Sequence, residues 1–259
     1  WSFESEADAR RKAEARAKLV FQQVTRGNRP QEYEYLERPL REQIVEPVMH
    51  DGEEIAKITR NRYGALVLNA RSVCFADVDF PPAEPEGVID AVLMFLSHAR
   101  RSARQRTVRE QMIRHVRDWA DRHPGRAFRL YRTRAGLRVL FTDDRYDPTA
   151  AATRALLEEL GSDDLYLRLT EKQACFRARL TPKPWRVGAK RPPVDYPFED
   201  DEEERAFRRW LRRYEDRCEA YATCELLDEY GTPGDEPHVR QIVALHDRHC
   251  CRDDGASLA

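Results

Sequence analysis

The sequence has no hydrophobic run long enough to span a bilayer, which requires roughly 20 consecutive apolar residues. The longest candidate, Val88 to Leu96, is too short and contains Asp90. We therefore expect no membrane-spanning segment and no membrane partner. Hydrophobic residues make up 41% of the 259 residues and charged residues 35%, a balance typical of a globular protein with a very polar surface.

Cysteine is scarce and irregularly spaced. The chain has six cysteines and no CxxC pair. This usage argues against a disulfide framework and predicts reduced thiols in a cytoplasmic protein. Several Cys and His residues near the end resemble metal ligands, but their spacings match no established zinc motif. We therefore expect a structural or incidental role for all of them: Cys218, Cys224, His238, His246, His249, Cys250 and Cys251.

The signature loops of several enzyme classes are also missing. The chain contains no Walker loop, no GxGxxG, no GxSxG and no HExxH. The formal net charge is only −1, but the charges are unevenly placed. Residues 126–145 are rich in Arg and aromatics, whereas residues 199–204 read EDDEEE. A nearly neutral total therefore leaves room for a local anion-binding face.

The most informative segment is SVCFADVDFPP, residues 72–82. The apolar run before Asp77 predicts a buried strand, and side chains alternate along a strand, so Asp77 and Asp79 share one face. Two adjacent carboxylates repel each other and are costly to bury without a cation between them. The pair is thus a candidate site for a divalent metal. The alternative is that both acids sit at a strand end and meet nearby arginines.

Two segments carry candidate anion-binding cations. The first, YRTRAGLR (residues 131–138), predicts a hairpin whose small turn residues let backbone NH groups approach a phosphate. The alternative is a turn whose exposed arginines bind nothing. In the second, residues 165–186, cations alternate with an aromatic residue, which suits phosphate and base contacts; the alternative is a charged edge strand. The cations and aromatic of the two segments are Arg132, Arg134 and Arg138, and then Arg177, Arg179, Lys183, Trp185 and Arg186.

The order of predicted elements indicates an α+β protein. Between residues 74 and 180 the pattern reads β–α–β–β–α–β, which matches an RRM-like, or ferredoxin-like, mixed sheet with two helices on one face. These helices are predicted at 107–122 and 149–160, and the last two strands at 165–169 and 175–180. Further helices are predicted at 4–26, 88–103, 202–230 and 238–249, and two strands at 54–58 and 63–68 joined by a turn at 60–62. This divides the chain into a helical arm (1–50), an RRM-like core (51–187) and a helical C-terminal extension (188–259).

An apolar strand ending in Asp-x-Asp, followed by a helix and a small-residue hairpin, resembles the catalytic core of the archaeo-eukaryotic primase (primase-polymerase) superfamily. Val73 to Asp79 matches the first motif of that family, and the chain resembles a divergent member. The second family motif, Ser-x-His, would fall in residues 132–138, where Arg138 replaces the His and no Ser is present. For the third family acid, the candidates are Asp163 and Asp164.

The resemblance implies a metal-dependent nucleotidyltransferase that uses Mg²⁺ or Mn²⁺, nucleoside triphosphates and a DNA or RNA partner. Asp77 and Asp79 would be catalytic and hold the metal. Two alternatives stay open, a non-catalytic nucleic-acid-binding module and a metal-dependent nuclease. In the enzyme, Arg132, Arg134 and Arg138 would bind the nucleotide, and Arg177, Arg179, Lys183, Trp185 and Arg186 the nucleic acid.

Overall fold

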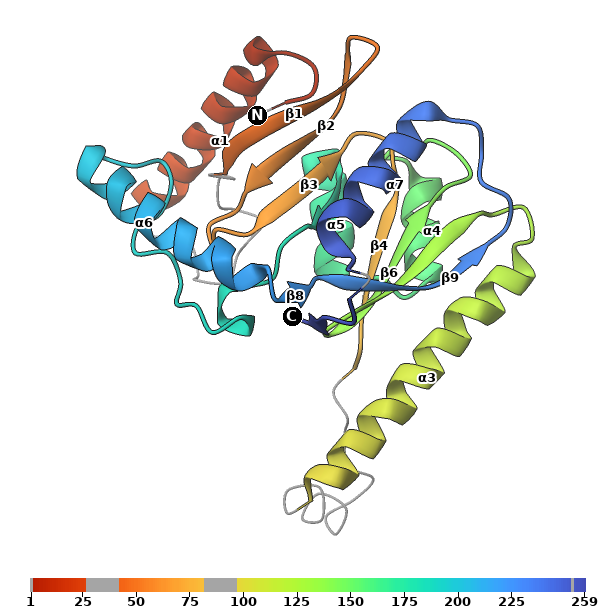
Figure 1. Ribbon diagram of the computed structural model, residues 1–259. Helices are drawn as coiled ribbons and strands as arrows, with labels where there is room; N and C mark the ends of the chain where they lie inside the picture. Colours follow the sequence, from red (N-terminus) through yellow and green to blue (C-terminus); the bar gives the residue numbers. More distant parts are fainter. Residues whose placement is uncertain (1, 27–41, 82–96, 253) are drawn as a thin grey trace.

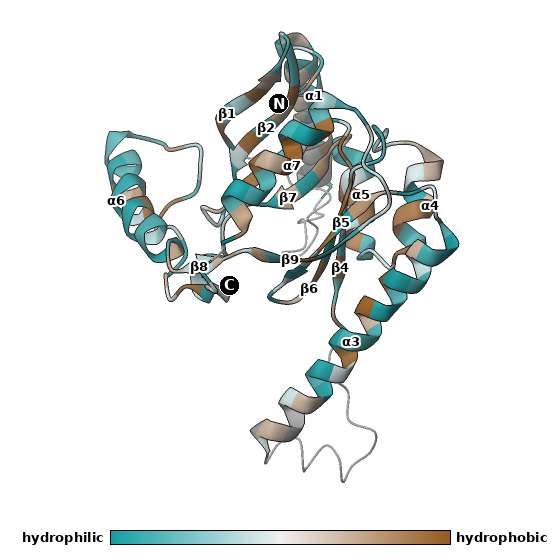
Figure 2. Ribbon diagram, turned by 45° about the vertical axis from the view of Figure 1, so that its right-hand side comes forward, coloured by the Kyte–Doolittle hydropathy of each residue, from teal (hydrophilic) through white to brown (hydrophobic). Residues whose placement is uncertain are grey.

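The computed structural model describes residues 2–26, 42–81, 97–252 and 254–259, and it shows an α+β fold. Two four-stranded antiparallel sheets lie at its centre, with helices packed around them (Figure 1). The strands carry much of the hydrophobic sequence, whereas α6 (Asp201–Cys218) is largely hydrophilic (Figure 2). None of the helices in the described ranges is long and apolar enough to cross a membrane.

The first sheet has the strand order β1-β2-β3-β7. A two-residue turn at Asp51-Gly52 joins its first two strands, and both turn residues have positive φ, which Gly adopts easily. The predicted hairpin around residues 60–62 is confirmed. Helix α1 (Glu6–Thr25) is also confirmed. The strands of this sheet are β1 (Gln43–His50), β2 (Glu53–Arg60), β3 (Leu66–Ala70) and β7 (Phe176–Arg179).

The second sheet has the strand order β4-β6-β5-β9. Its register places Asp77 directly opposite Arg138 and Asp79 directly opposite Gly136. Side chains alternate along these strands, so both acids lie on the same face of the sheet, as predicted. The strands are β4 (Phe75–Asp79), β5 (Phe128–Thr133), β6 (Gly136–Phe141) and β9 (Cys224–Tyr230).

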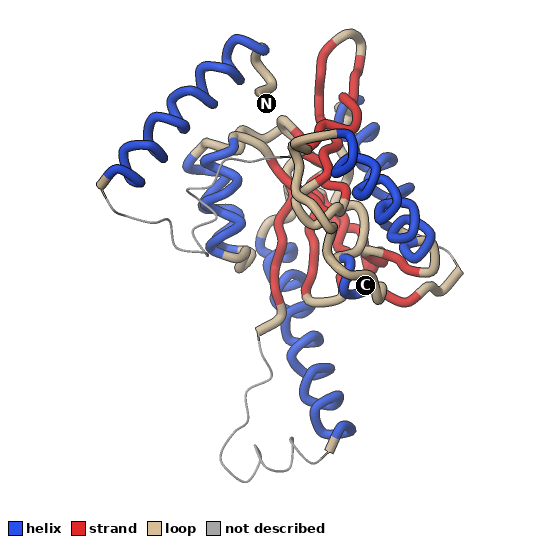
Figure 3. Tube along the Cα trace, turned by 90° about the vertical axis from the view of Figure 1, so that its left-hand side faces the viewer, coloured by secondary structure: helices blue, strands red, loops and turns tan. Residues whose placement is uncertain are grey.

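Different helices cover the two faces of this second sheet. Helices α3 (His98–Arg122) and α4 (Ala151–Glu159) lie on one face, as predicted: buried Trp119 packs on Phe128 and Phe141, and its Nε1 donates to Glu159 at 3.1 Å. The N-terminal part of α3 extends away from the sheets (Figures 1 and 3). Helix α7 (Pro237–Cys250) packs on the face that carries the two acids.

Three predictions about the second half of the chain are wrong. Residues 165–169, predicted as a strand, lie in helix α5 (Asp164–Gln173), because Asp163 caps the helix and Leu167 and Thr170 form one buried face three residues apart. Residues 175–180 were predicted as the last strand of the sheet that contains Asp77, but strand β7 pairs with β3 in the first sheet. The predicted helix 202–230 ends at Cys218, and the residues after it form β8 (Tyr221–Ala222) and β9.

These differences also change the predicted core. The C-terminal segment is not purely helical, since β9 pairs with β5 and becomes the last strand of the second sheet. The predicted mixed sheet is wrong as well, because both four-stranded sheets are antiparallel, and the parallel pairing in the described residues is the short ladder of β8 with β10 (Ser257–Leu258). The predicted helix at 88–103 lies partly outside the described residues; its described end belongs to α3.

Candidate functional site

Asp77 and Asp79 form the acidic centre of the site, at the end of β4. Burial raises the pKa of Asp79, and repulsion from Asp77 and Asp163 raises it further. Lys183 and Arg179 act in the opposite direction without cancelling this effect. The two strand acids therefore lie in an environment that favours an added cation beside them.

Asp163 is a third acid near this pair. Its backbone N–H donates to the carbonyl oxygen of Asp77 at 3.2 Å. One oxygen of its carboxylate accepts from the backbone N–H of Tyr166 at 3.0 Å, which caps α5. Of the two acids considered from the sequence, Asp163 is the one whose charge acts on Asp79, whereas Asp164 is an exposed residue in the first turn of α5.

Arg138 lies behind the acids and is almost completely buried, with 2% of its side chain exposed. Its Nε donates to Asp77 at 3.4 Å, and its Nη1 donates to the carbonyl oxygen of Arg179 at 3.1 Å. Although burial works against the charged form, the Asp77 carboxylate and the thiols of Cys250 and Cys224 hold the pKa of Arg138 above its ordinary value. Arg138 is therefore a fixed positive charge next to Asp77.

Three further cations face the acids: Arg179, Lys183 and Arg186. Burial lowers the pKa of Arg179 to about 10, and repulsion from Arg138 contributes. Burial and repulsion from Arg179 and Arg186 lower the pKa of Lys183, and burial and repulsion from Arg134 lower that of Arg186. These shifts show that positive charges are crowded together at this site.

This crowding is not relieved by salt bridges. Within the described residues, Arg179, Lys183 and Arg186 have no carboxylate within ion-pair distance. The buried Nε of Arg179 also lacks a hydrogen-bond partner in that part of the chain. A buried guanidinium usually has a carboxylate or another acceptor, since an unpaired buried charge is costly. The site thus has the electrostatics of an anion-binding site with an acidic pair at its edge.

The other residues singled out in the sequence lie apart from this centre. Arg177 forms a largely buried ion pair with Glu42 at 2.6 Å, so its charge is already satisfied. Arg132 pairs with Glu225 and belongs to the opposite sheet face, because its neighbour Tyr131 is the residue paired with Arg138. The structure therefore separates Arg132 and Arg177 from Arg138 and Arg179.

Arg134 and Trp185 lie near the edge of the site. Arg134 is in the turn between β5 and β6, where its Nη1 donates to the Leu258 carbonyl at 3.3 Å. Trp185 is 47% exposed, packs edge-on against Tyr63, and lies 5.7 Å from the Lys183 ammonium. An exposed ring beside cations provides a surface on which a base can stack.

A groove of about 1170 Å³ runs along the β5–β6 turn, beyond the end of β4. Phe80, which follows Asp79, forms part of its lining. The groove connects the end of β4 with a basic surface on α3. The arginines that line the groove are Arg106 and Arg109 on α3, Arg132 on β5 and Arg134 in the β5–β6 turn.

Sequence reasoning missed one feature, a buried cluster of Cys224, His246 and Cys250, whose ligand atoms all lie within 4.8 Å of one another. His246 and Cys250 are four residues apart on α7, a spacing that puts both on one helix face. That spacing was visible in the sequence. The third member, Cys224, comes from β9, which was predicted as helix, so no local pattern placed it with the other two.

In comparisons with known proteins, no family model matches the chain, and neither a curated protein nor a solved structure is significantly similar to it.

Proposed function

We propose that this protein is a metal-dependent nucleotidyltransferase of primase-polymerase type that acts on nucleic acid. The observation that carries the proposal is the pairing of the Asp77–Asp79 edge with buried or half-buried cations that have no carboxylate partner in the described residues. A nucleoside triphosphate complexed with a divalent cation has both charges that such a site requires, negative phosphates and a positive metal.

The topology of the second sheet supports the same proposal. Strands β4 and β5 run parallel, are connected through α3, and have β6 between them. We interpret this arrangement as the split βαβ unit that the RRM-like proposal requires. The acids lie on the face opposite α3 and α4. The chain departs from the RRM-like pattern at its last strand, since β9 lies beside β5 and not beside β4.

The residues present fit Mg²⁺ or Mn²⁺. Asp77 and Asp79 offer carboxylate oxygens on one face, and Asp163 is a third acid whose charge acts on Asp79. A bound divalent cation would neutralise phosphate charge and make an attacking hydroxyl more acidic. The repulsion that raises the pKa of Asp79 would then become attraction to a shared charge.

The chain's own cations would position the substrates. Arg138 is held by burial and by its hydrogen bonds to Asp77 and the Arg179 carbonyl, which suits it to fixing a triphosphate in one orientation. Arg179, whose Nε lacks a partner in the described residues, would contact a phosphate of the nucleic acid. Lys183 and Arg186 are half-buried and would contact phosphates nearer the solvent. The arginine-lined groove and the exposed Trp185 ring would hold the nucleic-acid strand.

The test is nucleotide incorporation with Mg²⁺ or Mn²⁺ on primed and unprimed DNA and RNA templates, with labelled nucleoside triphosphates. We expect the wild-type chain to extend at least one of these templates, and Asp79→Asn to abolish the extension. Asp216→Asn is the matched control, because Asp216 is an exposed acid on α6, and it should leave the activity unchanged.

The same assay separates the two alternatives. Loss of intact template without incorporation, dependent on Asp79, would replace the proposal with a metal-dependent nuclease that uses the same acids. Binding of nucleic acid without either reaction would replace it with a non-catalytic binding module. No binding and no reaction would remove nucleic acid from the proposal altogether.

A further inference from the structure

The buried cluster under α7 has the dimensions of a tetrahedral metal site. The Sγ of Cys224 lies 3.9 Å from Nε2 of His246 and 3.8 Å from Sγ of Cys251. With zinc–sulfur bonds of about 2.3 Å and zinc–nitrogen bonds of about 2.0–2.1 Å, tetrahedral geometry requires ligand separations of about 3.6 to 3.8 Å. The ligand atoms of Cys224, His246 and Cys250 lie within 4.8 Å of one another, close to the positions that one zinc ion would impose. Cys251 lies outside this group and touches it through Cys224, so its side chain would turn toward the ion to become the fourth ligand.

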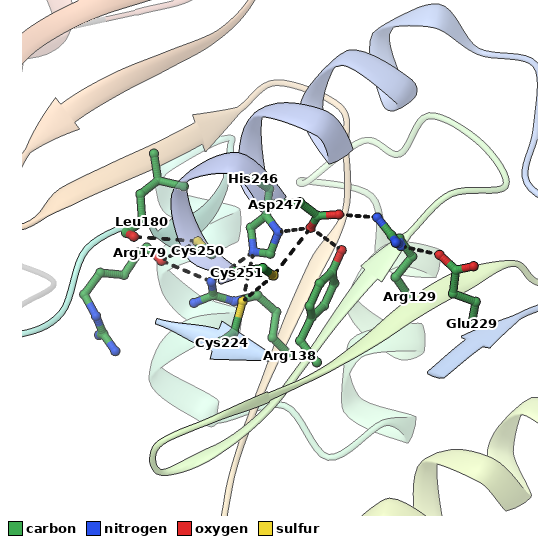
Figure 4. A network of polar contacts seen from close by, with 11 residues as sticks. Arg129, Arg138, Arg179, Leu180, Cys224, Glu229, His246, Asp247, Cys250 and Cys251 are labelled. Carbon is green, nitrogen blue, oxygen red and sulfur yellow. Dashed lines mark hydrogen bonds and ion pairs between the residues drawn. The ribbon is translucent and has the colours of Figure 1, made fainter. Parts of the chain in front are cut away.

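The orientation of His246 fits a metal ligand. Its Nδ1 lies 3.0 Å from the Asp247 carboxylate, which also accepts from Tyr131 at 2.6 Å and from Arg129 (Figure 4). A carboxylate can only accept, so Nδ1 carries the proton, and the lone pair of Nε2 accepts from Nη1 of Arg138 at 3.3 Å and lies 3.9 Å from the Sγ of Cys224. This carboxylate–histidine arrangement is the usual support of a zinc-bound imidazole.

The charge around the cluster also fits a metal with thiolate ligands. The Nη1 of Arg138 lies 3.3 Å from Nε2 of His246, so a buried cation borders the cluster. Its carboxylate partner in the described residues, Asp77, is 41% exposed. Zinc with three thiolates and one neutral imidazole carries a single net negative charge, which would balance Arg138 from the buried side.

We propose that Cys224, His246, Cys250 and Cys251 bind a structural zinc ion. The ion would join the C-terminal end of α7 to the start of β9, where the backbone N–H of Thr223 already donates to the carbonyl oxygen of Cys250 at 2.9 Å. All six cysteines are free thiols, so these ligands are available to a metal. The proposal is independent of the proposed function, because none of its four ligands belongs to the acidic pair.

The first test is the metal content of the wild-type protein. The full chain, without a polyhistidine tag, would be purified under reducing conditions from zinc-supplemented medium and measured by inductively coupled plasma mass spectrometry. We expect one zinc per chain. Replacement of zinc by Co²⁺ should give the visible absorption of a tetrahedral site together with thiolate-to-cobalt charge-transfer bands.

Variants then assign the ligands. Cys224→Ser, Cys250→Ser and Cys251→Ser should each weaken the charge-transfer absorption, and Asp247→Asn should weaken zinc affinity by about 10- to 100-fold. Cys175→Ser is the matched control, since Cys175 is a buried free thiol outside the cluster, and its Co²⁺ spectrum should equal that of the wild type. Asp79→Asn should also retain zinc, which separates this proposal from the catalytic one.

A ligand variant that fails to fold does not end the test, because chelation can be followed on the wild type. Removing zinc should lower the melting temperature, and adding zinc back should restore it. A reduced, folded wild-type protein that contains no zinc and binds no Co²⁺ would overturn the proposal. A disulfide from Cys224 to Cys250 or Cys251 in protein purified under reducing conditions would overturn it as well.

Discussion

Asp77 on β4 and Arg138 on β6 face each other across the ladder, with Oδ1 and Nε 3.4 Å apart. The same guanidinium reaches the Arg179 carbonyl and the His246 imidazole on its other side. Arg138 thus connects the acidic edge of the sheet with the buried Cys/His cluster.

The two acids should respond differently to neutralisation. Asp77→Asn removes the carboxylate that accompanies buried Arg138 and should destabilise the protein by about 1–3 kcal/mol, the cost of an unsatisfied buried donor. Asp79→Asn removes a carboxylate whose charged form is disfavoured, so its stability should lie within about 1 kcal/mol of the wild type or above it. Urea denaturation in EDTA measures the free energy of unfolding of each variant and of the wild type. Equal losses would mean that both acids are salt-bridge partners of arginines.

With metal present, the wild type should become more stable than Asp79→Asn. Millimolar Mn²⁺ should raise the melting temperature of the wild type by mass action, and Asp79→Asn should remove most of this rise. Asp216→Asn should keep it. A wild-type melting temperature that does not respond to Mn²⁺ would contradict the metal assignment.

The stability of the apo protein should carry the pH signature of Asp79. Because its folded pKa is raised above the ordinary 3.8, the carboxylate is unfavourable at neutral pH and this penalty disappears as the pH falls through the folded pKa. The advantage of Asp79→Asn over wild type should therefore shrink between pH 7 and pH 4. Melting curves of both proteins in EDTA measure this difference. An advantage that grows toward pH 4 would show that Asp79 is a stabilising ion-pair partner.

Arg179 and Arg177, two residues apart on β7, form a matched pair. Arg177→Gln breaks an ion pair and leaves the nearly buried Glu42 uncompensated, so it should destabilise the protein. Arg179→Gln removes a crowded cation and should be neutral or stabilising in the absence of ligand. Nucleic-acid titrations over a range of salt give the slope of the logarithm of the binding constant against the logarithm of the salt concentration. Loss of a phosphate contact in Arg179→Gln should reduce the magnitude of this slope by about one unit, whereas Arg177→Gln should leave it unchanged. The opposite assignment would place the phosphate contact at Arg177.

Gly136 should be essential for the geometry of the site. It lies opposite Asp79, and a Cβ added there would come within 2.2 Å of the Val78 carbonyl oxygen, which is backbone and cannot rotate away. Gly136→Ala should cost about 1–3 kcal/mol through overpacking and should weaken Mn²⁺ binding. Gly125→Ala, where nothing lies within 4 Å, is the control and should be tolerated. Unchanged Mn²⁺ binding in Gly136→Ala would disconnect this ladder from the metal site.

Local chemistry in the sequence was sufficient for much of the fold. Periodicity and turn residues predicted the hairpins around residues 61 and 135, the two helices on one sheet face, and the shared face of Asp77 and Asp79. These features depend on neighbours within a few residues. The prediction failed for residues 165–169, where a helix cap at Asp163 overrode an alternating pattern, and for 224–230, where pairing with β5 overrode helical composition.

The composition of the site was decided only by the tertiary structure. In the sequence, Arg177 and Arg179 are equivalent cations on one strand face. The fold brings Glu42, 135 positions away, to Arg177 and brings no described carboxylate to Arg179. Likewise, β9 carries Cys224 to His246 and Cys250 from outside their helix. Whether a buried charge is satisfied, or a thiol meets an imidazole, depends on contacts between distant segments, which no local pattern specifies.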